Sequence, residues 1–277
     1  MRAVVAFLLL LCSLAVSHGN GRGMMSMSGR GSPHRPGPGL GPRPGPGPGL
    51  LPCPSPGPRP RPAPVRRNCR EGPRLYGAMQ IDAGMGQVVV ADKYKRTYFL
   101  SGLTFYRLGR LGMKHVTVGA GGLWGTCHAN KVYKYVAGDF KLAKGLSMHQ
   151  VDAGGDGQIV GVGSGNYNAY CLKEETASGF CGRRTLSWTS LSRKMMYYSC
   201  GPRMGCWGVD KSYRIWVTKN ISPTNCRTSG WTAVPGPRRK MIEVSSDGKV
   251  YGVTTTGRIY ERMDLQGGSS AEWRHAD

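Results

Sequence analysis

Short apolar runs separated by turn residues fill the chain from Met79 onward and form five repeats. Each repeat opens with a five-residue segment, and successive segments start 35, 35, 47 and 45 residues apart. A second apolar run follows after a short turn, and a third and a fourth run each carry an aromatic residue. Runs of this kind, bounded by Gly, Asn and Asp, are typical of β-strands. The opening segments are Gln80-Ile81-Asp82-Ala83-Gly84, His115-Val116-Thr117-Val118-Gly119, Gln150-Val151-Asp152-Ala153-Gly154, Tyr197-Tyr198-Ser199-Cys200-Gly201 and Ile242-Glu243-Val244-Ser245-Ser246.

The repeat also predicts the fold class. Four antiparallel strands at this period are typical of a β-propeller blade, and no stretch has sustained helical periodicity. We therefore expect an all-β protein whose five repeats are the four-stranded blades of a propeller.

Recurrent residues within the repeats predict how the blades pack. The third run carries Phe99, Tyr133, Tyr170, Trp216 and Tyr260, and the fourth centres on Phe105, Phe140, Trp188, Trp231 and Trp273. Glycine near the end of the second run indicates strands crowded near a central channel, at Gly125, Gly161, Gly208 and Gly252. The tryptophans are expected to pack neighbouring blades together rather than to bind a ligand; they are Trp124, Trp188, Trp207 and Trp231.

The N-terminal part of the chain has a different composition. Residues 1–17 have a positive start, a short apolar core and small residues at Ala15 and Ser17, which is the pattern of a secretory signal. Residues 18–68 are rich in Pro, Gly and Arg, since fifteen of the nineteen prolines lie between Pro33 and Pro73. Such a segment has little to bury, so we expect a disordered tail, partly in polyproline II. Residues 69–277 then form the propeller domain of a secreted, extracellular protein.

The chain is strongly basic, with 38 Lys and Arg against 15 Asp and Glu, a formal charge of +23. Residues 1–74 hold eleven Arg and one Glu, so nearly half of this charge lies in the tail. No apolar run beyond the extreme N-terminus reaches the roughly 20 residues of a membrane span. The positive charge suggests one possible function, which stays open as an alternative. In it, a non-catalytic propeller docks an acidic protein or polyanion on its basic rim.

Motifs of known catalytic chemistry are missing from the sequence. It has no Gly-x-Ser-x-Gly elbow and no phosphate-binding loop, and its six histidines are scattered. The repeated Ser-x-Asp-x-Gly-x-x-Trp turn of sialidase-like propellers is missing too. We therefore expect no enzymatic activity, no cofactor, no metal site and no nucleic-acid partner.

Eight of the nine cysteines follow the predicted signal and would meet an oxidising compartment, where they should be mostly paired. Cys200 and Cys206 flank a five-residue hairpin turn, where facing positions can satisfy disulfide geometry. Asn220 begins the one glycosylation sequon, and Pro223 behind it disfavours the modification.

The loops between the second and third strands combine aromatic and planar polar side chains, which is the inventory that sugar recognition needs. A tyrosine in such a loop offers a large contact area and loses little conformational entropy on binding, because it has few rotatable bonds. It could equally be an ordinary turn residue. Recurrence on one rim favours the ligand interpretation. The candidates for sugar binding are Asp92, Tyr94, His128, Asn130, Asn166, Tyr167, Asp210 and Tyr213.

Several of the repeat segments resemble the fish-egg lectins, secreted proteins built from tectonin-type β-propeller repeats. The similarity covers roughly residues 69–277 and follows the order of the repeats, including Gln-Ile-Asp-Ala-Gly at Gln80 and Gln-Val-Asp-Ala-Gly-Gly-Asp at Gln150. The further segments that carry it are Ala169-Tyr170-Cys171-Leu172, Tyr197-Tyr198-Ser199-Cys200-Gly201-Pro202 and Met241-Ile242-Glu243-Val244.

The resemblance implies a non-enzymatic lectin that binds sugars of the N-acetylglucosamine or galactose class, or microbial surface glycans, in eggs or in innate defence. Bacterial lipopolysaccharide and egg-envelope glycoproteins are the partners it suggests. It also implies that Cys171 bridges to Cys226, and that Cys69 corresponds to a family cysteine near the mature N-terminus. The Pro- and Arg-rich tail departs from the family, and the pairing of Cys53, Cys127 and Cys181 stays open.

The number of repeats raises the question of ring closure. The family has six repeats whereas this sequence holds five, so it resembles a C-terminally shortened member. Five blades could contract into a closed ring, since propellers of four to eight blades exist. We expect the open ring instead, because the repeats keep the family's sequence without visible adaptation.

The tail gives a first prediction. Deleting residues 18–66 should leave the thermal midpoint of the propeller unchanged within error, because this segment can neither pack nor pair. The measurement is differential scanning calorimetry of the mature and shortened chains, and a large drop would mean that the tail is docked on the propeller.

Overall fold

The structure is a computed structural model that describes residues 72–182, 184–218, 221–263 and 273–276. The predicted signal, the tail, Cys53, Cys69 and Asn220 lie outside the described residues. Within them the chain forms five antiparallel sheets of four strands, each with its strands in chain order. This confirms the predicted all-β propeller of four-stranded blades.

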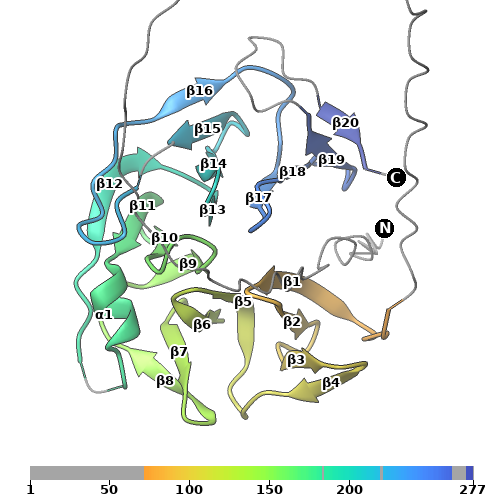
Figure 1. The fold of residues 1–277 in the computed structure, drawn as a ribbon, viewed down its shortest axis with the longest axis vertical. Helices are drawn as coiled ribbons and strands as arrows, with labels where there is room; N and C mark the ends of the chain where they lie inside the picture. The colour runs from red at the N-terminus through yellow and green to blue at the C-terminus, as the bar shows by residue number, and fades with distance from the viewer. Residues whose placement is uncertain (1–71, 183, 219–220, 264–272, 277) are drawn as a thin grey trace, which may run out of the picture. The chain divides into compact units, whose positions relative to one another are not determined.

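The strands follow one another as successive hairpins (Figure 1). Blade 1 comprises β1 (Ala78–Gly84), β2 (Gln87–Asp92), β3 (Thr97–Ser101) and β4 (Thr104–Arg107). Blade 2 comprises β5 (Met113–Gly119), β6 (Gly122–Cys127), β7 (Val132–Val136) and β8 (Asp139–Ala143). Blade 3 comprises β9 (Met148–Asp152), β10 (Ile159–Gly163), β11 (Asn168–Leu172) and β12 (Thr189–Lys194), with α1 (Glu174–Ser178) before β12. Blade 4 comprises β13 (Tyr197–Gly201), β14 (Gly205–Val209), β15 (Ile215–Thr218) and β16 (Thr232–Val234). Blade 5 comprises β17 (Met241–Val244), β18 (Val250–Val253), β19 (Ile259–Arg262) and β20 (Trp273–His275).

One apolar cluster fills each seam between successive blades. In all four seams, buried apolar residues of the second strand of one blade meet buried residues of the first strand of the next. Trp124 is fully buried in the seam between blades 2 and 3, and Trp207 is buried between blades 4 and 5. Trp188 and Trp231 pack at the edges of two clusters. The tryptophans therefore pack the blades together, as predicted.

Two of the predicted aromatic positions need correction. The third-run aromatics all lie on the third strand of their blade, but Trp188 and Trp231 come one residue before β12 and β16. In both blades extra residues precede the fourth strand, and in blade 3 they include α1. These extra residues make the repeats of blades 3 and 4 longer than those of blades 1 and 2 and displace the aromatic from the strand.

Packing of the inner strands connects the blades in chain order but does not close them into a ring. β1 packs against β5, β5 against β9, β9 against β13, and β13 against β17. Among the described residues no comparable packing joins β17 or β18 to β1 or β2. In Figure 1 the blades follow one another around one centre, from β1 to β17. This is the packing expected of the open form rather than of a closed ring of five.

A repeated hydrogen bond runs across every seam. In blades 1 to 4, the polar side chain at the third position of the opening segment accepts a hydrogen bond. The donor is the backbone N–H at the fourth position of the next blade's opening segment. The pairs are Asp82 with Val118 (2.8 Å), Thr117 with Ala153 (3.0 Å), Asp152 with Cys200 (3.0 Å) and Ser199 with Val244 (3.1 Å). Each bond satisfies a backbone donor that the packing of two sheets would otherwise leave buried and unpaired.

These bonds also fix the register of the fifth repeat. Val244 donates to Ser199, so Val244 takes the fourth position and Glu243 the third. The opening segment of blade 5 is therefore Met241–Ser245, one residue earlier than the sequence pattern indicates. In this register Glu243 is the counterpart of Asp82 and Asp152, which shifts an acidic residue into the polar position.

Glycine at the fifth position lets adjacent inner strands approach closely. A β-carbon built on Gly119 would lie 1.8 Å from the carbonyl oxygen of Ala153, and one on Gly84 would lie 2.1 Å from that of Val118. Both contacts are with backbone atoms, which cannot turn away as a flexible side chain could.

Two disulfides hold blades 3 and 4. Cys200 and Cys206 face each other across the β13–β14 hairpin with a Cα separation of 4.0 Å, and Cys171 bridges to Cys226 with a separation of 5.7 Å. Both predicted pairs are confirmed. Cys127, which is buried, and Cys181, which is exposed, are not paired with each other or with another described cysteine.

The close seam gives a second prediction. Gly119→Ala should lower the free energy of unfolding by about 2–3 kcal/mol, because the added methyl group overpacks the seam against backbone. Chemical denaturation monitored by tryptophan fluorescence provides the measurement. The matched control is Gly165→Ala, whose added β-carbon would meet nothing within 4 Å. Equal stability of the two variants would contradict the close approach of these strands.

Candidate functional site

The turns between the second and third strands share one backbone geometry. At the tip of each turn one residue has a positive φ, and its N–H closes the turn onto the preceding strand. Its carbonyl oxygen then accepts a hydrogen bond from the N–H of a residue at or just before the start of the next blade. These bonds join Met113 to Lys95, Met148 to Asn130, Met195 to Tyr167 and Arg239 to Tyr213, at 2.7–3.0 Å. The structure thus holds four equivalent side chains at fixed places on one rim.

The two predicted aspartates lie beneath this rim. Asp92 is 1% exposed and accepts the backbone N–H groups of Tyr94 and Arg96 as well as the Arg96 guanidinium. Asp210 is 6% exposed and accepts from the corresponding groups of Ser212 and Arg214. The Trp216 indole also donates to Asp210, as the Tyr98 hydroxyl does to Asp92. Burial alone would raise the pKa of both carboxyl groups, but these hydrogen bonds outweigh it and lower the pKa. Their oxygens are engaged within the turn, so these side chains shape the turn.

Tyr167 lies on the rim of blade 3 beside a small cavity. Its ring is 39% exposed and stacks on His149, with centroids 4.9 Å apart and an interplanar angle of 27°. The neighbouring cavity has a volume of about 280 Å³, and Asn166 and Tyr170 are in its lining. Asn166 donates to the Tyr170 hydroxyl at 2.7 Å, which fixes its amide at the edge of the cavity.

The other candidates are spread over different blades. Tyr94 is 64% exposed, with Lys93 and Arg96 each within 5 Å of its ring centroid. His128 is exposed, and Asn130 accepts a hydrogen bond from Lys114. Tyr213 is 37% exposed on the rim of blade 4. The structure therefore brings candidates together within each turn, such as Asn166 with Tyr167, and does not gather all eight in one pocket.

The central channel contains a polar cluster that the sequence interpretation missed. Asp82, Asp152 and Glu243 alternate there with the hydroxyl residues Thr117 and Ser199 at the third position of successive blades. Ser199 donates to Asp152 at 3.3 Å, and Thr117 hydrogen-bonds Asp82. The recurring polar residue in an otherwise apolar strand was the available signal, and the shifted register of blade 5 hid its fifth member.

A hydrogen-bonded path crosses the channel beside these carboxyl groups. His115 Nε2 lies 3.1 Å from the hydroxyl oxygen of Tyr197, and that hydroxyl donates to Glu243. Burial, with Lys114 nearby, lowers the pKa of His115 to about 3, so the ring is neutral at physiological pH.

Burial raises the pKa of all three channel carboxyl groups. Repulsion from Asp82 adds to the effect at Asp152, whose pKa rises to about 7. Repulsion from both aspartates adds to it at Glu243, whose pKa is well above the usual range. The channel therefore favours protonated, neutral acids, which can donate as well as accept hydrogen bonds.

No group of three or more His, Cys, Asp or Glu side chains in the described ranges is placed to hold a metal ion. None of the helices there has the length and apolar character that crossing a membrane requires.

Comparison with known proteins assigns the family. The model of the Tectonin domain matches residues 77–277, which is more than half of the chain and includes all five blades. The chain belongs to the Tectonin-domain family. It is 39% identical over 117 residues to the fish-egg lectin of Cyprinus carpio, a stretch that covers 42% of this chain and 48% of that relative. The match thus spans about half the length of the relative.

Solved structures resemble the chain more distantly. Human WBSCR16 has a TM-score of 0.49 and 11% identity over 71% of this chain and 67% of its own. Prp20p of Saccharomyces cerevisiae has a TM-score of 0.47 and 9% identity over 72% of this chain and 65% of its own. Similarity at this level adds nothing to the family assignment.

The channel acids give a third prediction, on pH. Because the pKa of Asp152 is raised from 3.8 to about 7, its protonation stabilises the fold fully below pH 3.8, and this stability is lost as pH rises to 7. Because the pKa of His115 is lowered, this residue makes the fold less stable as pH falls below 6.5, which opposes the effect of Asp152. The informative quantity is therefore the difference in unfolding free energy between a variant and the unmodified protein. Asp152→Asn mimics the neutral acid and should be the more stable protein at pH 8, by on the order of 2–4 kcal/mol.

Urea denaturation at pH 5 and at pH 8 measures this effect. The difference in unfolding free energy between Asp152→Asn and the unmodified chain should grow with pH. Glu175→Gln, an exposed acid on α1, is the control and should show no such trend. A difference independent of pH would show that Asp152 is ionised throughout.

Proposed function

We propose that the protein is a secreted, non-catalytic lectin that binds glycans on the rim formed by the turns between second and third strands. N-acetylglucosamine and galactose are the sugar classes proposed, with microbial or egg-envelope glycans as natural partners. Support comes from the Tectonin-domain match and from the partial similarity to a protein named as a lectin. The shared geometry of these turns supports the rim as the location of binding.

The main support for placing the sugar-binding site on the rim is that tyrosine occupies a position where the backbone conformation favours glycine. Tyr167 and Tyr213 have φ of +60° and +62°, a left-handed conformation that costs a residue with a β-carbon roughly 1 kcal/mol. Blade 5 has Gly257, with a φ of +85°, at the equivalent position. Residues in unfavourable backbone conformations concentrate at functional sites, so the retention of a half-exposed ring at this cost favours a role in binding.

The chemistry of the rim suits a sugar ring. A tyrosine face can cover the apolar C–H side of a pyranose, and its phenol hydroxyl stays available at the edge for hydrogen bonding. Asn166, Asn130 and His128 supply planar polar groups for the sugar hydroxyls. Weak sites repeated in successive blades would act together on a multivalent glycan.

The test is the double variant Tyr167→Gly and Tyr213→Gly. Glycine adopts the left-handed conformation freely, so the thermal midpoint should stay within roughly 3 °C of that of the unmodified protein. Retention on N-acetylglucosamine- and galactose-agarose at low salt should fall at least tenfold, because both ring faces are lost. Calorimetry and affinity chromatography of the same preparations give the two readouts.

The control is Tyr106→Gly, which removes an exposed tyrosine on β4, away from these turns. If the double variant is retained on the resins as well as the unmodified protein, the rim tyrosines do not form the binding site. Failure of the unmodified protein to bind either resin would overturn the lectin proposal. Binding that free sugar does not compete and that salt abolishes would instead identify the alternative function, docking of a polyanion on the basic rim.

A further inference from the structure

Two arginines meet on one tryptophan where blade 3 borders blade 4. Arg193 of β12 and Arg214 of the turn before β15 have their guanidinium carbons 3.1 and 5.7 Å from the centroid of the Trp216 ring. Arg214 directly follows Tyr213 in the chain. The residue after β12 donates its backbone N–H to the carbonyl oxygen of Tyr167, the other rim tyrosine. The two guanidinium groups therefore belong to the same rim as the proposed sugar-binding turns.

A buried carboxylate fixes the guanidinium group of Arg214. Asp210 accepts a hydrogen bond from its Nε at 2.8 Å and another from the Trp216 indole at 3.0 Å, so the arginine and the ring share one anchor. The Arg214 side chain is 61% exposed, and no described residue accepts a hydrogen bond from its Nη groups. An arginine held through Nε keeps both Nη groups available as donors to a ligand.

Arg193 has no acidic partner of its own among the described residues, although its side chain is half-buried. Burial lowers the pKa of its guanidinium group, and the nearby charge of Arg214 lowers it further, against an opposing effect of Asp210. Arg238 brings another positive charge to the same turn, where it donates to the carbonyl oxygen of Ser212. One carboxylate thus faces several guanidinium groups, and an anion bound there would neutralise the excess positive charge.

The backbone of β12 is irregular where it carries Arg193. Ser192 has a φ of +53°, and the pairing of β11 with β12 shifts register between Asn168 and Tyr170, which indicates a β-bulge. A bulge turns a side chain away from the direction that a regular strand would give it, and bulges are common next to functional sites. The irregular backbone therefore supports a binding role for Arg193.

Blade 1 shows which part of this arrangement serves the turn itself. Arg96 donates from Nε to Asp92 at 2.6 Å, and the Tyr98 hydroxyl donates to the same carboxylate. The group of acid, arginine and aromatic residue is therefore common to both turns. Over the Tyr98 ring, however, the described part of the chain places no arginine besides Arg96. The second guanidinium group, that of Arg193, is what distinguishes blade 4.

A pair of guanidinium groups favours one class of anion. A carboxylate has two oxygens, which a single guanidinium group can satisfy with two parallel hydrogen bonds. A sulfate or phosphate ester has three terminal oxygens in a tetrahedral arrangement, so it can accept hydrogen bonds from two guanidinium groups at once. Arginine suits such oxyanions because its donors lie in a rigid plane.

We propose that the rim at the border of blades 3 and 4 binds a saccharide that carries a sulfate or phosphate ester, with Arg193 and Arg214 holding the ester group. The inference rests on the proposed lectin function and adds to it the class of sugar. The sugar ring lies against Tyr213, next to Arg214 in the chain, and the ester provides the selectivity over neutral sugars.

Isothermal titration of the full chain at low salt tests this with N-acetylglucosamine, its 6-sulfate, its 6-phosphate and inorganic sulfate as probes. The unmodified protein should bind at least one of the two esters roughly tenfold or more tightly than the neutral sugar, because the ester adds charge-assisted hydrogen bonds. In Arg193→Gln the affinity for the ester should fall to that for the neutral sugar. The thermal midpoint of this variant should stay within roughly 3 °C, since only the contact with the Trp216 ring is lost.

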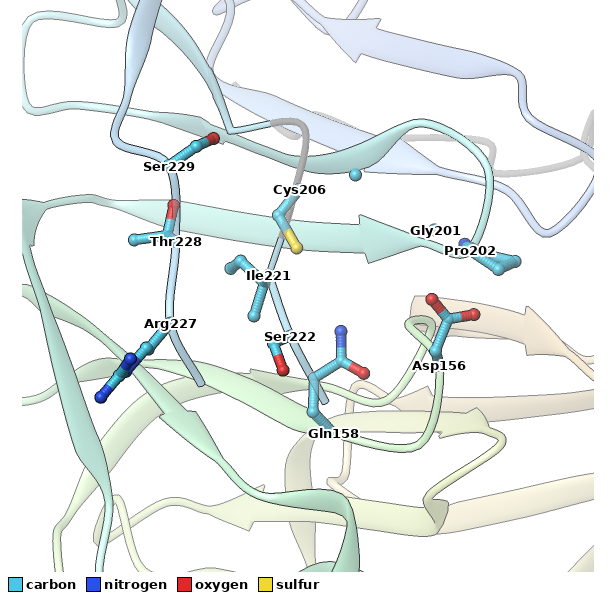
Figure 2. Close-up of a pocket in the computed structure, with 11 residues that line it drawn as sticks. Asp156, Gln158, Gly201, Pro202, Cys206, Ile221, Ser222, Arg227, Thr228 and Ser229 are labelled. Carbon is cyan, nitrogen blue, oxygen red and sulfur yellow. The ribbon is translucent and has the colours of Figure 1, made fainter. Parts of the chain in front are cut away.

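Arg227→Gln is the matched control, because it removes the same charge from the same blade. Arg227 is exposed and lines a separate cavity of about 370 Å³ between the β9–β10 and β13–β14 turns. Figure 2 shows its side chain well apart from Asp156, the acidic residue of that cavity. No ion pair or aromatic contact of the Arg227 side chain is found within the described residues, so this variant should keep the full preference for the ester.

Equal affinity of the unmodified protein for the esters and the neutral sugar overturns the inference and leaves the lectin proposal intact. A preference that survives in Arg193→Gln, or that Arg227→Gln abolishes as well, also overturns it, because the preference then reflects the general charge of the protein. Inorganic sulfate that binds as tightly as the esters would reveal an anion site without sugar recognition, and would overturn it too. Binding of an ester that depends on Arg193, without binding of the neutral sugar, supports the inference and refutes the proposed neutral sugars. If none of the sugars binds, both proposals fail.

Discussion

The hydrogen bond between a polar side chain in one inner strand and a backbone N–H in the next is the interaction on which this propeller depends. Asp82, Thr117, Asp152 and Ser199 each accept from the blade that follows, and each bond sits beside an apolar cluster that excludes water. Apolar packing alone would let two sheets slide along each other. The bond sets their register, because a shift of one residue would leave a buried donor and a buried acceptor unpaired. The rim turns are positioned with the same blades, because the carbonyl oxygen at the tip of each turn accepts a hydrogen bond from the connection to the next blade.

Much of the fold could be predicted because it repeats. Alternation of short apolar runs with turns indicated four strands per repeat, and five recurrences indicated five blades; the model of the Tectonin domain spans all of them. The hairpin position of Cys200 and Cys206 followed from local spacing. The bridge between Cys171 and Cys226 depended on family resemblance, since the two residues are 55 positions apart and no local pattern relates them.

The candidate site was less predictable because its features arise from three-dimensional context. Asp92 and Asp210 are residue types common in ligand-binding loops. Only the structure shows that three donors within each turn, and one on the following strand, engage their carboxylates. Sequence spacing does not reveal the left-handed conformation of Tyr167 and Tyr213, nor the hydrogen bond that each of their carbonyl oxygens accepts from the connection to the next blade.

The extra residues that lengthen the third and fourth repeats form a belt on the outer edge of the middle blades. Lys134 of blade 2 donates to the carbonyl oxygens at the end of α1, at 2.6 and 3.2 Å, and the N–H of Glu174 at its start donates to Pro223 of blade 4. The Cys171–Cys226 bridge joins the same two outer segments covalently. Blades 2 to 4 are thereby fastened at both the inner and the outer radius, whereas no described outer tie of this kind reaches blades 1 and 5. The three middle blades are therefore cross-linked at two radii by bonds between segments far apart in the sequence, which should make their outer edge resistant to local unfolding.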